Sequence, residues 1–117
     1  MRLILPLPPN AANSRRHWRV VLRDKKAYWQ SLDLLKASKA LPRARKPVRA
    51  KIAATLYVWG LMDDDNALAR LKPLLDWLVA HDYLPGDSRK HIEWAGMPEQ
   101  HIDRKNQRVE LEIENAA

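Results

Sequence analysis

The sequence predicts an α+β domain with a small mixed or antiparallel sheet and two main helices, in the order β-α-β-α-β-β. Three observations support this prediction: alternation of side chains between two faces over residues 48–59, leucines at helical spacing over residues 66–80, and a second alternating segment over residues 108–114. The 117 residues suit a single domain that spans residues 1–117.

The first elements are expected to be a short strand and a long helix. Residues 2–7 are apolar, and Pro6 within them indicates the edge of a sheet, because proline cannot donate a ladder hydrogen bond. The helix is expected to begin at about Asp24, a favourable N-cap, and to end at about Ala40, before Pro42. Its apolar stripe consists of Tyr28, Leu32 and Leu35.

The alternation over residues 48–59 predicts a half-buried strand. Its apolar face consists of Val48, Ala50, Ile52, Ala54, Leu56 and Val58. The second helix is expected from Asn66 to about Ala80, and Pro73 inside it is expected to kink or restart the helix, because proline lacks a backbone donor. The remaining elements are a turn over residues 83–87 and two strands over residues 91–97 and 108–114.

The charges are divided unevenly along the chain, whose net charge is +7. Residues 1–51 carry 14 Lys and Arg against 2 Asp and Glu, whereas residues 52–117 carry 7 against 12. The basic half favours a polyanion such as DNA as partner, and the acidic half offers ligands for cations. The absence of cysteine excludes disulfides and Cys-ligated metals. No apolar stretch is long enough to span a membrane, so a cytoplasmic protein is expected.

Residues 61–78 read LMDDDNALARLKPLLDWL, with three consecutive aspartates ahead of the leucine-rich helix. Two interpretations are open. The acidic residues stabilise the start of the helix, with Asp65 or Asn66 as its cap, or they bind a metal ion. In an extended segment Asp63 and Asp65 point the same way, whereas in a helix they diverge by roughly 200°. Carboxylate oxygens suit Mg²⁺ or Mn²⁺, and capping is compatible with metal binding.

Several motifs together resemble the RusA family of Holliday-junction resolvases. The central ones are D-D-D-N, followed by L-x-x-L-K-P-L-L-D-W-L and then Y-L-P-G-D-S. The opening L-P-L-P-P-N, with an Arg- and Trp-rich segment after it, is also similar to the start of that family. These motifs cover most of the chain in the family's order, so the resemblance implies a RusA-like fold.

The resemblance implies a catalytic site made of Asp63, Asp65, Asp87 and Lys72. The three aspartates would hold Mg²⁺, with Mn²⁺ as a substitute, and Lys72 would sit beside the scissile phosphate. The chain departs from the family pattern in two places. About one helical turn is inserted before Lys72, which makes Arg70 a competing candidate for the catalytic cation, and Gly86 stands where relatives often have an acid.

The implied activity is metal-dependent hydrolysis of phosphodiester bonds in four-way DNA during recombination and repair. Family members act as homodimers, because a junction needs two matched cuts and a two-fold dimer presents two equal sites. No membrane and no small-molecule cofactor is involved, and the setting is a bacterial or phage-infected cell. The alternatives are a DNA-junction-binding protein without cleavage, a less selective branched-DNA nuclease, and an interaction protein without a DNA role.

The basic residues ahead of and within the first helix are the predicted contacts to the DNA backbone. Trp18 among them either stacks on an unpaired base or packs against the core. The predicted DNA-binding residues are Arg15, Arg16, Trp18, Arg19, Arg23, Lys25, Lys26 and Arg70.

Overall fold

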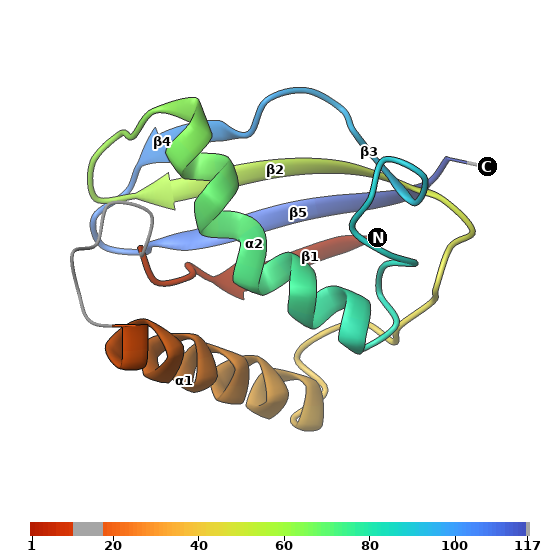
Figure 1. The fold of residues 1–117 in the computed structure, drawn as a ribbon, viewed down its shortest axis with the longest axis horizontal. Coiled ribbons are helices and arrows are strands. Elements are labelled where there is room, and N and C mark those ends of the chain that lie inside the picture. The colour runs from red at the N-terminus through yellow and green to blue at the C-terminus, as the bar shows by residue number, and fades with distance from the viewer. Residues whose placement is uncertain (11–17, 117) are drawn as a thin grey trace.

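The computed structural model describes residues 1–10 and 18–116, which form two helices and a five-stranded sheet. The elements are β1 (Arg2–Pro6), α1 (Trp18–Ala37), β2 (Ala50–Val58), α2 (Asp64–Ala80), β3 (Ile92–Trp94), β4 (Glu99–Ile102) and β5 (Arg108–Asn115). Both helices lie on the same side of the sheet, with α2 running obliquely across the strands and α1 beside β1 (Figure 1). The fold is therefore α+β, as the sequence predicts.

The sheet is mixed, with the strand order β1-β5-β2-β3 and with β4 also paired to β2. β5 is antiparallel to both β1 and β2, whereas β3 and β4 are parallel to β2. β1 pairs only with β5, so the edge position that Pro6 indicates is confirmed. The Pro6 carbonyl, at the end of this strand, accepts a hydrogen bond of 2.8 Å from the Tyr28 hydroxyl on α1.

The strand expected over residues 91–97 is present only as the shorter β3, Ile92–Trp94, and a further strand, β4, follows it at Glu99–Ile102. β3 pairs with the beginning of β2, where Ile52 lies opposite Trp94, and β4 pairs with its end, where Thr55 lies opposite Glu99. The four residues between the two strands include Gly96 and a proline, both unfavourable in a strand interior. The chain therefore leaves the edge of β2 and rejoins it, and β4 is an element that the sequence analysis missed.

The core lies between the sheet and the helices and is built from alternate residues of the strands. In β2 the predicted apolar face is buried from Ala50 to Val58, but Val48 is 79% exposed because it precedes the strand. Tyr28 and Leu32 of α1 are buried and Leu35 packs against the core, which confirms the predicted stripe. α2 contributes Ala67, Leu71, Leu74, Leu75, Trp77 and Leu78.

The predicted start of α1 is wrong, because the helix begins at Trp18 and Asp24 lies inside it. Asp24 is a good capping residue, but nothing ends the helical conformation ahead of it, and the side chains of Val20 and Val21 in the preceding turn are half-buried. The helix ends at Ala37, and the following Lys39 takes a left-handed conformation with φ of 61°.

The start of α2 also differs from the prediction. The helix begins at Asp64 with Asp63 as its N-cap, so Asn66 lies in the first turn and the prediction that it caps the helix is wrong. Acidic residues in a first turn are stabilised by the helix dipole, which explains why the helix extends to them. The expected restart at Pro73 is wrong, because α2 runs through this residue as one helix, and the Pro73 carbonyl accepts a hydrogen bond of 2.9 Å from Trp29 Nε1.

Candidate functional site

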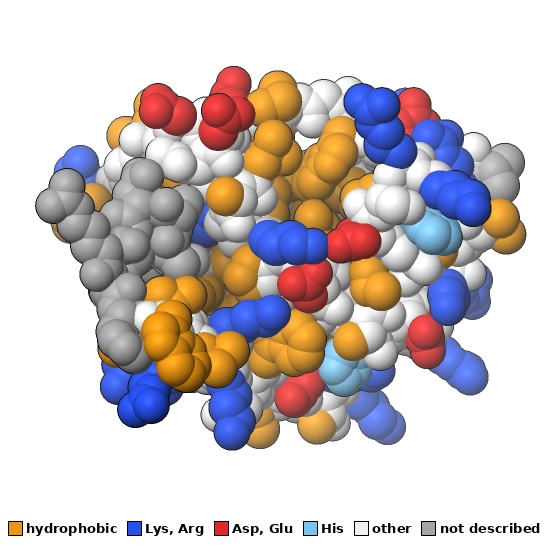
Figure 2. Space-filling view, viewed as in Figure 1, with side chains coloured by type: hydrophobic (Ala, Val, Ile, Leu, Met, Phe, Trp, Pro, Cys, Tyr) orange, Lys and Arg blue, Asp and Glu red, His pale blue; other side chains and the backbone are white. Residues whose placement is uncertain are grey.

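The acidic turn at the start of α2 is held in place by β4. The Gln100 side chain accepts a hydrogen bond of 2.9 Å from the Met62 amide and donates one of 2.7 Å to the Met62 carbonyl. These two bonds fix the backbone directly before Asp63, whose own side chain makes no capping hydrogen bond. The three aspartates are consequently exposed at a fixed helix terminus (the red group above α2 in Figure 2).

Asp63 and Asp65 do not lie together in one extended segment. Asp63 has extended backbone angles, but Asp65 already belongs to the helix, so strand-like alternation does not relate the two side chains. The interpretation of these residues as favourable charges at a helix N-terminus fits this geometry.

The middle of α2 carries the closest contact between predicted site residues. Lys72 Nζ lies 2.7 Å from Asp87 Oδ2, in the loop after α2, and 3.1 Å from Asp76 Oδ1, one turn further along the helix. Lys25 of α1 lies 3.6 Å from the other oxygen of Asp76. The result is a surface cluster of alternating charges, visible as adjoining blue and red side chains over the middle of α2 (Figure 2).

This cluster shifts the titration of its two central groups. The hydrogen bond from Lys72 holds the pKa of the Asp87 carboxyl below its ordinary value. The same bond, with a second one to Asp76, raises the pKa of the Lys72 ammonium. Lys72 is therefore charged and Asp87 ionised at neutral pH.

Asp65 and Lys72 lie on the same side of α2, because seven residues make almost two full turns. Their α-carbons are separated by about 10 Å along the helix axis, given a rise of 1.5 Å per residue. Ala69 lies between them with a small, exposed side chain. Within residues 1–10 and 18–116, no three His, Cys, Asp or Glu side chains are grouped as a metal site would need.

Arg70 lies away from the Lys72 cluster. Its Nε donates a hydrogen bond of 2.7 Å to the Pro8 carbonyl, and burial lowers the pKa of its guanidinium. Two residues apart on a helix, Arg70 and Lys72 point in roughly opposite directions. Of the two candidates for a catalytic cation, only Lys72 contacts Asp87.

The predicted DNA-binding residues are only partly described, since Arg15 and Arg16 lie outside the described ranges. Trp18, 63% exposed, is not a core residue, and it begins the exposed part of α1. Lys25 is engaged by Asp76 and lies 5.2 Å from the centre of the Trp29 ring. The exposed basic residues of this half of the helix are Arg19, Arg23 and Lys26.

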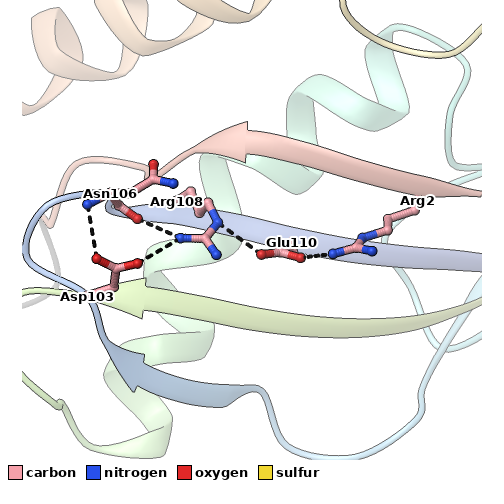
Figure 3. Close-up of polar contacts among 5 residues, drawn as sticks. All are labelled: Arg2, Asp103, Asn106, Arg108 and Glu110. Atoms are coloured by element: carbon pink, nitrogen blue, oxygen red, sulfur yellow. Dashed lines mark hydrogen bonds and ion pairs between the residues drawn. The ribbon is translucent and has the colours of Figure 1, made fainter.

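A second polar cluster, which sequence reasoning missed, covers the face of the sheet that the helices leave open. Arg108 on β5 donates to Asp103 Oδ2 at 3.1 Å, to Glu110 Oε2 at 2.9 Å and to the Asn106 carbonyl at 2.9 Å (Figure 3). Arg2 on β1 also belongs to this cluster, because its guanidinium donates a hydrogen bond to the other oxygen of Glu110. The alternation along β2 could have indicated this face, because it assigns Tyr57 and Trp59 to the side opposite the core.

Comparison with known proteins adds no family assignment. A search against protein-family models and a search of the curated proteins each find no match to this chain. The RusA resemblance therefore rests on the sequence motifs alone. Among the described residues, no helix combines the length and apolarity that crossing a bilayer would require.

Proposed function

We propose that this protein is a RusA-like, Mg²⁺-dependent endodeoxyribonuclease that resolves four-way DNA junctions by paired hydrolysis of phosphodiester bonds. The observation that carries the proposal is the 2.7 Å contact between Lys72 and Asp87. The resemblance implies that both residues are catalytic, and they come from different parts of the chain to meet on an exposed surface. Asp65, on the same side of α2, is the third residue of the proposed set.

Asp63, Asp65 and Asp87 are the residues that would hold the metal ion. Hard carboxylate oxygens are the donors that Mg²⁺ and Mn²⁺ prefer, and among the described residues Asp63 and Asp65 form no ion pair that would compete. When bound, the ion would activate water and offset charge on the phosphate. Asp87 is the exception in this set, because its carboxylate already contacts Lys72.

Lys72 would bring a positive charge to the scissile phosphate. The carboxylates of Asp76 and Asp87 hold Nζ from two sides, and their hydrogen bonds raise the pKa of the Lys72 ammonium. A cation fixed before the substrate arrives stabilises developing negative charge without reorganisation during the reaction. Arg19, Arg23 and Lys26 on α1 would contact phosphates farther along the duplex arms.

We also propose that the active form is a homodimer in the cytoplasm of a bacterial or phage-infected cell. A four-way junction has two-fold symmetry, and two identical sites related by such an axis can make matched cuts. This part of the proposal rests on the resemblance and on the substrate's symmetry.

The test is cleavage of end-labelled four-way, flap and linear DNA in Mg²⁺ and in EDTA. We expect paired, symmetric nicks in the four-way junction only with Mg²⁺. Asp65→Asn should bind the junction without cutting it, whereas Asp64→Asn, a matched change in the same exposed turn, should retain cleavage. If the purified protein nicks none of the three substrates in Mg²⁺ or Mn²⁺, the nuclease proposal fails.

A second candidate is a junction-binding protein of the same fold that does not cleave. Two observations favour it: Lys72 neutralises Asp87, and the described residues contain no three-ligand group. Such a protein would bind four-way DNA equally well in EDTA and in Mg²⁺ and would leave it intact. A protein that nicks flaps and four-way junctions equally would instead be a less selective nuclease.

A further inference from the structure

Trp59 is a large aromatic side chain that the core does not use. It follows directly after β2, and 62% of its surface is exposed. The guanidinium of Arg104, in the loop between β4 and β5, lies 4.7 Å from the centre of its ring. Arg104 Nε also donates a hydrogen bond of 3.2 Å to the Trp59 carbonyl. The two contacts hold the guanidinium over one face of the indole, and the residue as a whole remains exposed.

The loop that carries Arg104 is anchored from below by Arg108. This side chain binds Asp103 at one end of the loop and the Asn106 carbonyl at the other (Figure 3). A further hydrogen bond of 3.2 Å, from the backbone N–H of Asn106 to Asp103 Oδ1, closes the turn. Arg104 and its neighbour Lys105 are therefore presented on a fixed, exposed turn.

The two cations of this turn are not neutralised by the carboxylates around them. Asp103 and Glu110 are both engaged by Arg108, and Glu99 lies 3.6 Å from His101. Within the described residues, neither Arg104 nor Lys105 forms an ion pair with a carboxylate. An anionic ligand is the partner that two cations without a carboxylate partner complement.

The neighbouring aromatic ring, Tyr57, is contacted by two side chains, whereas in the described part of the chain Trp59 is contacted by Arg104 alone. Arg108 lies 3.7 Å from the centre of the Tyr57 ring, and His101 stacks on the same ring at 5.5 Å. Trp59, two residues along, has no aromatic neighbour among the described residues. It is therefore the ring on this face that a flat ligand can reach.

An exposed indole beside uncompensated cations matches the two parts of a nucleotide. A base stacks on an aromatic face, and phosphates are bound by arginine and lysine. We propose that Trp59, Arg104 and Lys105 form a binding site for an unpaired nucleotide within a single DNA strand. The base would stack on the Trp59 indole and the flanking phosphates would contact the two cations.

The position of this site connects it with the acidic turn of α2. Gln100 of β4 binds the backbone at Met62, and the same strand leads directly into the loop that carries Arg104. If the protein acts on branched DNA, as proposed above, this site would hold a strand that is unpaired at the branch next to the proposed catalytic end of α2. Binding at this site can be tested without catalysis.

The test compares two labelled oligonucleotides of equal length by fluorescence anisotropy in EDTA: oligothymidylate, and an abasic strand with the same phosphates. Trp59→Ala should weaken binding of oligothymidylate about 10-fold and leave the abasic strand unchanged, because stacking needs the base. Trp59→Phe retains a ring and should restore most of the loss. Arg104→Ala should weaken binding of both strands, whereas Lys51→Ala, an exposed lysine near the start of β2, should affect neither.

The inference is overturned if Trp59→Ala binds oligothymidylate as tightly as the unchanged protein. It is also overturned if the variant loses affinity equally for the abasic strand, since binding would then depend on phosphates alone. Circular dichroism of Trp59→Ala checks folding, which an exposed residue should not disturb. Base-dependent binding without junction cleavage would refute the nuclease proposal and support this nucleotide site. Junction cleavage that Trp59→Ala leaves unchanged, with no base-dependent binding, would support the nuclease proposal and refute this site.

Discussion

Lys72 and Asp87 are 15 residues apart in the chain, yet Lys72 Nζ and Asp87 Oδ2 are 2.7 Å apart in the structure. Both side chains are about half exposed, and ion pairs at such positions contribute little to stability. The contact instead raises the pKa of the Lys72 ammonium and lowers that of the Asp87 carboxyl, two groups that lie beside each other on an open surface. The first prediction concerns this electrostatic coupling.

Replacing Lys72 with methionine should raise the pKa of Asp87 towards its ordinary value of 3.8, because the hydrogen bond from Lys72 is the main cause of the depression. Titration of the Asp87 side-chain carboxyl by NMR measures this. A carboxyl whose pKa is lowered in the folded state stabilises the fold at pH values above its ordinary pKa. This contribution is lost as the pH falls through the pKa of the folded state. The acid sensitivity of the unchanged protein should therefore exceed that of Lys72→Met below about pH 4. An unchanged Asp87 pKa would contradict the coupling.

Substitutions of Lys72 and Arg70 should have different effects, the first on junction cleavage and the second on the free energy of unfolding. Lys72→Ala should lower junction cleavage by about 100-fold, the cost of removing one fixed electrostatic group, with little change in stability. Arg70→Ala should retain cleavage but lower the free energy of unfolding by about 2 kcal/mol, because a charged hydrogen bond to the Pro8 carbonyl is lost. Urea unfolding and single-turnover cleavage measure the two effects. The reverse pattern would make Arg70 the catalytic cation.

Trp77 and Asp33 provide a prediction about the packing of α1 on α2. Trp77 is fully buried, and its Nε1 donates a hydrogen bond of 2.9 Å to Asp33 Oδ1. Asp33→Ala should lower the free energy of unfolding by about 1–3 kcal/mol, because the buried indole N–H loses its acceptor. Asp33→Asn keeps an acceptor and serves as the matched control in urea unfolding. Equal stability of the two variants would show that this hydrogen bond is not needed.

Lys25 and Lys26 are adjacent on α1 but differ in their surroundings. Lys25 contacts Asp76 and Trp29, whereas Lys26 is exposed. If α1 contacts duplex phosphates, Lys26→Ala should reduce the slope of log K against log salt by about 0.9, the value of one phosphate contact. Lys25→Ala should change the slope less. Binding of duplex DNA at several salt concentrations measures both, and identical slopes for all three proteins would argue against a DNA surface at Lys26.

Local patterns predicted much of the fold correctly. The alternation over residues 48–59 identified β2 and its buried face, and the leucine spacing identified α2, because burial of one side repeats every second residue in a strand and about every 3.6 in a helix. The failures lie at boundaries. Asp24 and Asn66 are favourable caps by residue type, yet both lie inside helices. An N-cap residue acts only where the helix actually begins, which its own identity does not decide.

The candidate site was predicted only as a set of residues. The sequence and its resemblance to RusA named Asp63, Asp65, Asp87 and Lys72, and the structure brings Lys72 and Asp87 into contact. No local pattern could choose between Lys72 and Arg70, because that choice depends on which side of α2 faces the loop after it. The Trp59–Arg104 contact was missed for a similar reason, since its partners are 45 residues apart.

The sequence by itself determined the class of the fold, the identity of its main strand and second helix, and the residues of its core, because these follow from the repeat of apolar side chains along each element. Only the tertiary structure decided that β3 and β4 are separate parallel strands on β2, that Lys72 rather than Arg70 contacts Asp87, and that Trp59 lies against Arg104. These features join distant segments, and they depend on the paths of loops whose sequences carry no periodic signal.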